Sequence, residues 1–215
     1  MATVLQPLTY ADLEQELGVG YMAPYLVAAS GDFARAVRMH TWNADVGAAF
    51  HRPLSLVEVA IRNRADAALT TVFGLHWWLA PDFLDQATVV TRSALAAAAA
   101  HATARGRGGH AAVVAEITFG TLVAILRPRF FDLVWRVHQR AVFPNRRGSR
   151  FASIATTADR LLRLRNAIVH HEPLLAMDLA ALHQDLLDTL GWMSHQLQAQ
   201  AQAISFVPTV LAARP

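Results

Sequence analysis

The chain of 215 residues contains no cysteine and no lysine. The absence of cysteine excludes a disulfide framework, a thiolate zinc site and a cysteine nucleophile. Because lysine is absent, all 19 basic residues are arginine, and the guanidinium group stays protonated at any ordinary pH. The sequence pI of about 10.1 is therefore mainly a consequence of arginine usage, since the formal net charge is only +3.

Charged residues are scarce, at 16% of the chain, yet no apolar stretch is long enough to suggest a membrane span. The most apolar segment, 111–126, is interrupted by Glu116. The N-terminus carries acidic residues where a secretory signal has basic ones, so we expect a cytoplasmic protein with no membrane partner. Hydrophobic residues make up 54% of the sequence, which favours a substantial folded core.

The few charges are unevenly distributed along the chain. Residues 1–85 carry 5 arginines and 9 acidic residues, whereas residues 86–170 carry 13 arginines and 3 acidic residues. Residues 171–215 carry 1 arginine and 4 acidic residues. The middle segment therefore has a net charge of +10 between two acidic ends, which indicates an anionic partner for that segment.

Apolar residues recur with a helical period, and no segment shows the alternation of a half-buried strand. We expect an all-α fold of seven to nine helices in one domain over 1–203, with 204–215 as a poorly packed C-terminal tail. Thr9 and Asp32 are predicted helix caps, and Pro53 is a predicted helix start. The expected helices are 9–17, 22–29, 33–50, 53–73, 86–104, 111–126, 130–142, 151–171 and 178–203. One predicted core stripe consists of Leu54, Val57, Ile61 and Ala65.

The segment 160–173 combines arginine, asparagine and histidine near the end of a predicted helix. Arg163, Asn166 and His170 lie at i, i+3 and i+7 and share one face, and an amide one turn before an imidazole can orient it. Arg165 lies about 140° around the helix from His170, but its long side chain can reach a common anion. Cleavage of RNA by its own 2′-hydroxyl uses such groups, because histidine moves protons and arginine binds phosphate. The same residues also suit an ordinary helix end before Pro173, and spacing alone leaves both interpretations open.

Arg165-Asn166 followed by His170 resembles the R-x(4–6)-H signature of HEPN-domain ribonucleases. The whole run 164–173, LRNAIVHHEP, is similar to the LRN…HHEP block of the Abi-like (abortive infection) proteins, a HEPN branch. Further blocks resemble that family in the same order: WN at 42–43, LEVALRN at 56–63, G.WW at 74–78 and ELTFG at 116–120. The chain departs from the family pattern at 39–41 and at 121–122, where aromatic residues are usual.

The resemblance implies an all-helical, HEPN-like homodimer whose two motifs form one composite, metal-independent ribonuclease site that needs no cofactor. By position, Arg165 binds the scissile phosphate, Asn166 orients His170, and His170 is the general acid or base, with His171 as a second candidate. The family acts in phage defence or as a toxin, so an antitoxin or another regulatory partner is expected. A non-catalytic HEPN-type RNA-binding or regulatory dimer is the alternative, and a structural domain without an RNA partner is a third.

Glu58 and Arg62 match a recurrent pair of the family. Their i, i+4 spacing predicts a structural salt bridge, and a supporting role at the active site is the alternative. The ten histidines form no zinc-binding motif, so no metal site is expected. A further set of arginines is predicted to contact the RNA backbone, with a solvated arginine-rich surface as the alternative. These residues are Arg146, Arg147, Arg150, Arg160 and Arg163.

Overall fold

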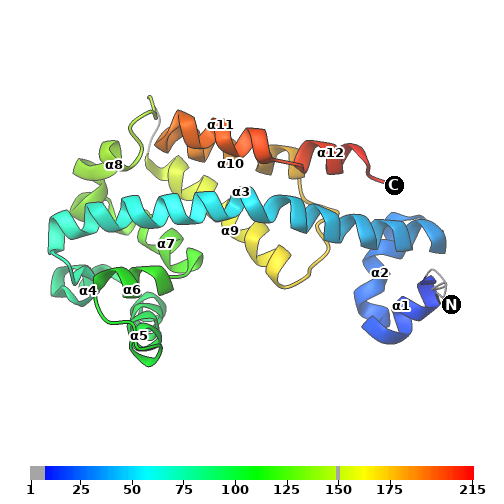
Figure 1. The fold of residues 1–215 in the computed structure, drawn as a ribbon, viewed down its shortest axis with the longest axis horizontal. Coiled ribbons are helices and arrows are strands. Elements are labelled where there is room, and N and C mark those ends of the chain that lie inside the picture. Colours follow the sequence, from blue (N-terminus) through cyan, green and yellow to red (C-terminus); the bar gives the residue numbers. More distant parts are fainter. Residues whose placement is uncertain (1–7, 149–150) are drawn as a thin grey trace. The chain divides into compact units, whose positions relative to one another are not determined.

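The computed structural model describes residues 8–148 and 151–215, and within these ranges the chain forms helices and turns with no strand (Figure 1). The all-α prediction is confirmed, but the described ranges contain twelve α-helices and the predicted number of seven to nine is wrong. Their bounds are α1 Tyr10–Leu17, α2 Val19–Ala28, α3 Phe33–Phe73, α4 Pro81–Gln86, α5 Val89–Ala104, α6 His110–Glu116, α7 Phe119–Ile125, α8 Arg136–Val142, α9 Phe151–Val169, α10 Leu179–Met193, α11 His195–Ile204 and α12 Val207–Ala212. Trp77–Leu79 and Pro128–Phe130 form 3₁₀ turns, and Phe131–Trp135 forms a π-helical turn.

The first helices begin at the predicted caps. Thr9 Oγ1 accepts a hydrogen bond from the Asp12 N–H at 3.3 Å, while the Asp12 carboxylate accepts one from the Thr9 N–H at 2.8 Å. This reciprocal pair is a capping box, and the hydrogen bonds from Thr9 lower the pKa of the Asp12 carboxyl. Asp32 caps α3 in a similar way, because its Oδ1 accepts from the Arg35 N–H at 2.9 Å.

The helix α3 continues without interruption through Pro53, so the predicted break between two helices at this position is wrong (Figure 1). Proline has no N–H, and the carbonyl of Ala49 therefore lacks the partner it has in a regular helix. Apolar side chains on both sides of Pro53 are buried, including Phe50, Leu54 and Val57. Their burial stabilises the helical backbone by more than one missing hydrogen bond costs. The predicted stripe over 54–65 is confirmed as core.

Two other predicted helices are each divided in two. The apolar segment 111–126 breaks at Ile117, which is extended, and Thr118 then caps α7 by accepting from the Thr121 N–H at 3.3 Å. The segment 178–203 breaks at Ser194, whose Oγ accepts from the Leu197 N–H at 3.3 Å. In both places a hydroxyl satisfies a backbone donor that a continuous helix would pair, so capping competes with helix propagation. An apolar period alone does not reveal such a break.

Contacts divide the chain into two compact units. Unit 1 comprises the described residues up to Arg52, together with 164–183 and 205–215. Unit 2 comprises the described residues of 53–163, together with 184–204. Both α3 and α9 contribute residues to each unit.

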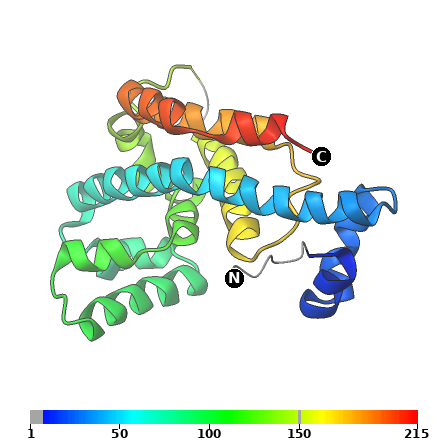
Figure 2. The ribbon, with the colours of Figure 1, turned by 45° about the vertical axis from the view of Figure 1, so that its right-hand side comes forward.

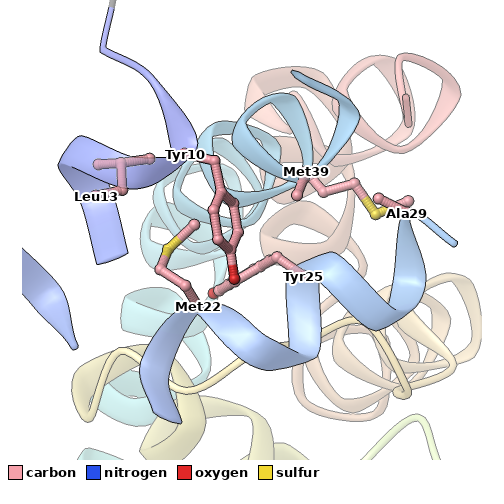
Figure 3. Packing of buried hydrophobic residues seen from close by; sticks show 7 residues of the cluster. Tyr10, Leu13, Met22, Tyr25, Ala29 and Met39 are labelled. Carbon is pink, nitrogen blue, oxygen red and sulfur yellow. The ribbon is translucent and has the colours of Figure 1, made fainter. Parts of the chain in front are cut away.

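The core of unit 1 forms where α1 and α2 pack against the first turns of α3. Side chains from these helices lie in one cluster (Figure 3). Met22 and Tyr25 are completely buried in it, and burial raises the pKa of the Tyr25 phenol well above its ordinary value. Partly buried Tyr21 packs against the same cluster. This packing fixes the N-terminal part of α3, which carries several polar side chains described below.

Residues 205–215 belong to unit 1, and the expectation that 204–215 is a poorly packed tail is wrong. Val207 is buried, and the Trp42 indole N–H donates to the Val210 carbonyl at 2.8 Å. The Arg214 guanidinium lies over the Trp42 ring at 5.1 Å and donates to the Leu175 carbonyl at 3.4 Å. A buried indole needs an acceptor, and α12 supplies it.

In unit 2, α5 lies beside α6 (Figure 2), and the first residue of α6 joins a hydrogen-bonded group. The Asp66 carboxylate accepts from the Trp77 indole at 2.8 Å and from His110 Nε2 at 2.9 Å. His110 Nδ1 donates to the Leu75 carbonyl. Because the Leu75 carbonyl and the Asp66 carboxylate are both acceptors, this arrangement favours the imidazolium form of His110, in which both ring nitrogens carry protons. Burial alone would lower the pKa of His110, but the hydrogen bonds to Asp66 and Leu75 and the carboxylate charge together raise it.

The raised pKa of His110 predicts a pH-dependent stability. A group whose pKa is raised on folding contributes its full stabilisation below the unfolded pKa, about 6.5, and loses it as pH rises through the folded pKa. We therefore expect the free energy of unfolding to fall as pH rises above neutrality, and His110→Gln to flatten this dependence. Urea unfolding from about pH 6 to about pH 9 measures it. The exposed His101 provides the control, because His101→Gln should keep the wild-type pH profile.

Candidate functional site

The helix α9 ends at Val169 in a Schellman turn, two residues before the predicted end. The Glu172 N–H donates to the Ala167 carbonyl at 2.8 Å, and the His171 N–H donates to the Ile168 carbonyl at 3.2 Å. His171 adopts the left-handed conformation with φ 56°, at the position where glycine is usual in this motif. His170 and His171 therefore differ in backbone conformation, because His170 continues the helical hydrogen bonding through its N–H to the Asn166 carbonyl at 2.9 Å.

A histidine at the left-handed position costs free energy that glycine would not. The left-handed conformation costs an L-residue about 1–2 kcal/mol, so we expect His171→Gly to stabilise the protein by about 1 kcal/mol. The neighbouring His170→Gly is the matched control and should not stabilise, since His170 is not in the left-handed region. Urea unfolding of both variants measures the difference. A loss of stability in His171→Gly would show that the imidazole makes favourable contacts exceeding the backbone strain.

The predicted catalytic residues lie together at this end of α9. Arg165 and Asn166 are half-buried, while His170 and His171 are exposed. The Asn166 side-chain oxygen accepts a hydrogen bond from Arg165 Nη1 at 3.4 Å, so the amide is directed to the guanidinium. Among the described residues, no carboxylate forms an ion pair with Arg165. The predicted contact of the Asn166 amide with the His170 ring stays a prediction, since their hydrogen bond in the structure joins backbone atoms.

Asn43 holds the segment that follows the Schellman turn. Its side-chain oxygen accepts from the Leu174 N–H at 2.7 Å, and its Nδ2 donates to the Glu172 carbonyl at 3.3 Å. Pro173, between these two residues, has no N–H to offer. Asn43 is only 8% exposed, so its amide replaces water for two backbone groups. The sequence placed Asn43 in a family-like block but did not identify this role, which joins residues 131 positions apart.

Replacing Asn43 should therefore loosen the turn after α9. Asn43→Ala leaves the buried Leu174 N–H without its acceptor, and a buried unsatisfied donor costs about 1–3 kcal/mol. We expect a loss of that size in urea unfolding and faster hydrogen exchange at Leu174. Asn63→Ala is the matched control, because Asn63 is an exposed asparagine of the same helix. Equal stability of the two variants would contradict the anchoring role of Asn43.

The remaining predicted residues belong to unit 2. Glu58 and Arg62 form the predicted i, i+4 salt bridge at 2.8 Å. Arg160 pairs with Asp185 at 3.1 Å, and Arg163 is exposed. A role for the Glu58–Arg62 pair in the chemistry stays a prediction, as does RNA contact by Arg160 and Arg163.

Arg146 and Arg147 belong to a basic segment that precedes α9. Arg146 donates to Ser153 Oγ at 2.6 Å, and its guanidinium lies 4.5 Å from the centre of the Trp192 ring. Its burial lowers the pKa of the guanidinium, which indicates a packing role for this arginine. Arg147 is exposed, and Arg150 lies outside the described residues. RNA contact by this segment stays a prediction.

Across residues 8–148 and 151–215, no group of three or more His, Asp or Glu side chains is placed to hold a metal ion. No helix in those ranges has the length and apolar character that crossing a bilayer requires. No protein-family model, curated protein or solved structure matches the chain. The candidate site is therefore defined by the geometry of α9 and the turn that follows it.

Proposed function

We propose that this protein is a metal-independent endoribonuclease of the HEPN type, in the Abi-like branch, acting in phage defence or as a toxin. The proposal rests on the motif at 165–170 and its collinear sequence blocks. The observation that carries it is the environment of Arg165. This guanidinium is half-buried, its hydrogen-bond partner is the neutral amide of Asn166, and no carboxylate of the described chain pairs with it.

A partly desolvated cation without a carboxylate favours an anionic ligand, because burying an unpaired charge is costly. Some other arginines in the described chain have carboxylate partners, whereas half-buried Arg64 donates to two backbone carbonyls. Arg160, five residues earlier on α9, pairs with Asp185, and Arg127 pairs with Asp159 at 2.7 Å. The planar donor fork of arginine matches two phosphate oxygens. The contrast between Arg160 and Arg165 supports phosphate as the ligand of Arg165.

The chemistry follows from the groups beside that cation. The ribose 2′-oxygen attacks the adjacent phosphorus as the bond to the leaving 5′-oxygen breaks, which yields a 2′,3′-cyclic phosphate and a 5′-hydroxyl. His170 takes the proton of the 2′-hydroxyl or delivers one to the 5′-oxygen. Arg165 stabilises the negative charge that develops on the phosphate oxygens. Two imidazoles are needed for both proton transfers, and a homodimer would supply a second motif.

The test is RNA cleavage by the purified full chain in the presence of EDTA. Mass spectrometry of the products identifies their ends. We expect 2′,3′-cyclic phosphate and 5′-hydroxyl termini, with cleavage unaffected by the chelator. Products with 5′-phosphate ends, or binding of RNA without any cleavage, would contradict the proposal, and the second result would favour a non-catalytic HEPN-type RNA-binding or regulatory dimer. Analytical ultracentrifugation measures the oligomeric state, and co-purification tests for an antitoxin.

A further inference from the structure

A cleft of about 360 Å³ lies in unit 1 beside the turn that ends α9. The volume falls within the range of about 300–1,000 Å³ typical of small-molecule sites. One wall comes from α3, the other from the end of α9 and the segment after it, and one residue comes from α2. The lining residues are Tyr21, His40, Asn43, Ala44, Gly47, Ala48, His51, Ile168, His171, Glu172 and Leu174. The predicted catalytic motif shares His171 with this cleft and otherwise lies beside it along α9.

The wall that α3 contributes carries only small residues in its middle. Ala44, Gly47 and Ala48 share one helical face, with His40 one turn before Ala44 and His51 one turn after Gly47. A Cβ on Gly47 would meet Ile168 Cγ2 at 3.5 Å, so the two walls are nearly in contact at that residue and no ring fits between them there. A ligand in the cleft must lie beside this contact, and the face that it turns to α3 must tolerate apolar contact.

The two ends of this wall carry imidazoles. His40 is packed edge-on against Tyr21 and Tyr25, with ring centroids 5.8 Å and 5.3 Å away. Its burial lowers the pKa of the imidazole, which keeps His40 neutral at physiological pH and able both to donate and to accept. His51, at the other end, is exposed, and His171 faces the cleft from the opposite wall. Histidine side chains therefore lie at both ends of the apolar middle of the α3 wall.

Glu172 adds an acidic residue to the opposite wall. The backbone carbonyl of Glu172 is held by Asn43, which fixes the position of this residue relative to α3. An ionised carboxylate only accepts hydrogen bonds. No arginine lines the cleft, so a free phosphate group is not its natural occupant. A ligand with an apolar face and N–H donors on its edge matches the chemistry of these lining residues.

We infer that this cleft is a nucleobase subsite, which takes the base of an RNA nucleotide next to the scissile phosphate and favours a base with an exocyclic amine. RNA-binding proteins recognise unstacked bases by contact with their faces and by hydrogen bonds to their edges. Adenine, guanine and cytosine offer an exocyclic amino group to Glu172, whereas the donor on the pairing edge of uracil is its ring N3–H alone. The inference rests on the proposed ribonuclease function for its place in a reaction, but base binding itself is measurable without cleavage.

The test uses nucleosides, which carry no phosphate. Titration of the full chain with adenosine, cytidine and uridine, followed by NMR of the histidine ring protons, should shift the signals of His40, His51 and His171. We expect adenosine and cytidine to bind more tightly than uridine, and ribose 5-phosphate to leave His40 and His51 unshifted. Equal shifts with ribose 5-phosphate would overturn the assignment of the cleft to a base.

A matched pair of variants connects the binding to the cleft. Ala48→Leu places a larger side chain on an exposed lining position, and Ala34→Leu makes the same change at an exposed position of α3 outside the lining. We expect Ala48→Leu to weaken adenosine binding by about tenfold or more and Ala34→Leu to leave it unchanged. Unchanged binding in Ala48→Leu would overturn the inference.

Experiments can refute the ribonuclease function and the nucleobase subsite independently of each other. If nucleosides bind as described but RNA is not cleaved, the subsite stands and the ribonuclease function falls. If RNA is cleaved and Ala48→Leu alters neither nucleoside affinity nor the preference for amino-bearing bases beside the cut, the ribonuclease function stands and the subsite falls.

Discussion

Replacing His170 by alanine should lower the rate of RNA cleavage by about 10²–10⁴-fold, the range that a general acid or base contributes. Arg165→Ala should lower it by about 10²–10³-fold, because the role proposed for the guanidinium is to stabilise charge that develops on the phosphate. Both losses should appear in the maximal rate at saturating RNA, since each interaction strengthens in the transition state. Single-turnover cleavage of a labelled RNA measures them.

Three further variants separate chemistry from binding and from folding. Arg165→Lys keeps the charge but not the planar fork, so it should recover only part of the rate. Arg163→Ala removes an exposed arginine two residues away and should weaken RNA binding in a salt-dependent way without lowering the maximal rate. His171→Ala tests the second candidate histidine. If His171→Ala loses the rate and His170→Ala does not, the general acid or base is His171, and equal activity of all variants would contradict the assigned roles.

Local signals in the sequence predicted much of the fold. The capping box of Thr9 and Asp12 and the cap at Asp32 need only neighbouring residues, and the structure contains all of them. The core stripe beginning at Leu54 follows from helical periodicity. Breaks in helices were harder to predict. Pro53 was expected to begin a helix, but the helix continues through it because the buried side chains on either side outweigh one lost hydrogen bond.

In the candidate site, too, the sequence predicts the local features but not those that depend on tertiary packing. Proximity of Arg165, Asn166 and His170 follows from their spacing on one helix. The left-handed conformation of His171 was not predictable from residue type, because glycine is the usual residue at the left-handed position that ends a helix. The hydrogen bond between Asn43 and Leu174 joins residues 131 positions apart. Only the packing of α3 beside the end of α9 within unit 1 brings these residues together. The histidine-lined cleft depends on the same packing of separate segments. For that reason, no sequence motif predicts the cleft.

The largest expected loss of stability comes from unit 2, where Trp77 is 1% exposed. Its ring lies edge-on to Trp78 and Phe83, with centroids 5.6 Å and 5.1 Å away, and its indole N–H donates to Asp66. Truncating a buried tryptophan costs about 3–5 kcal/mol, a large share of a typical total of about 5–15 kcal/mol. We therefore expect Trp77→Ala to lower the urea midpoint by a large fraction, measured by circular dichroism. Trp77→Phe keeps an aromatic ring and should lose about 1–3 kcal/mol, mainly through the unpaired Asp66 oxygen. Equal losses in the two variants would mean that the hydrogen bond to Asp66, which also holds His110, stabilises unit 2 more than the packing of the ring does.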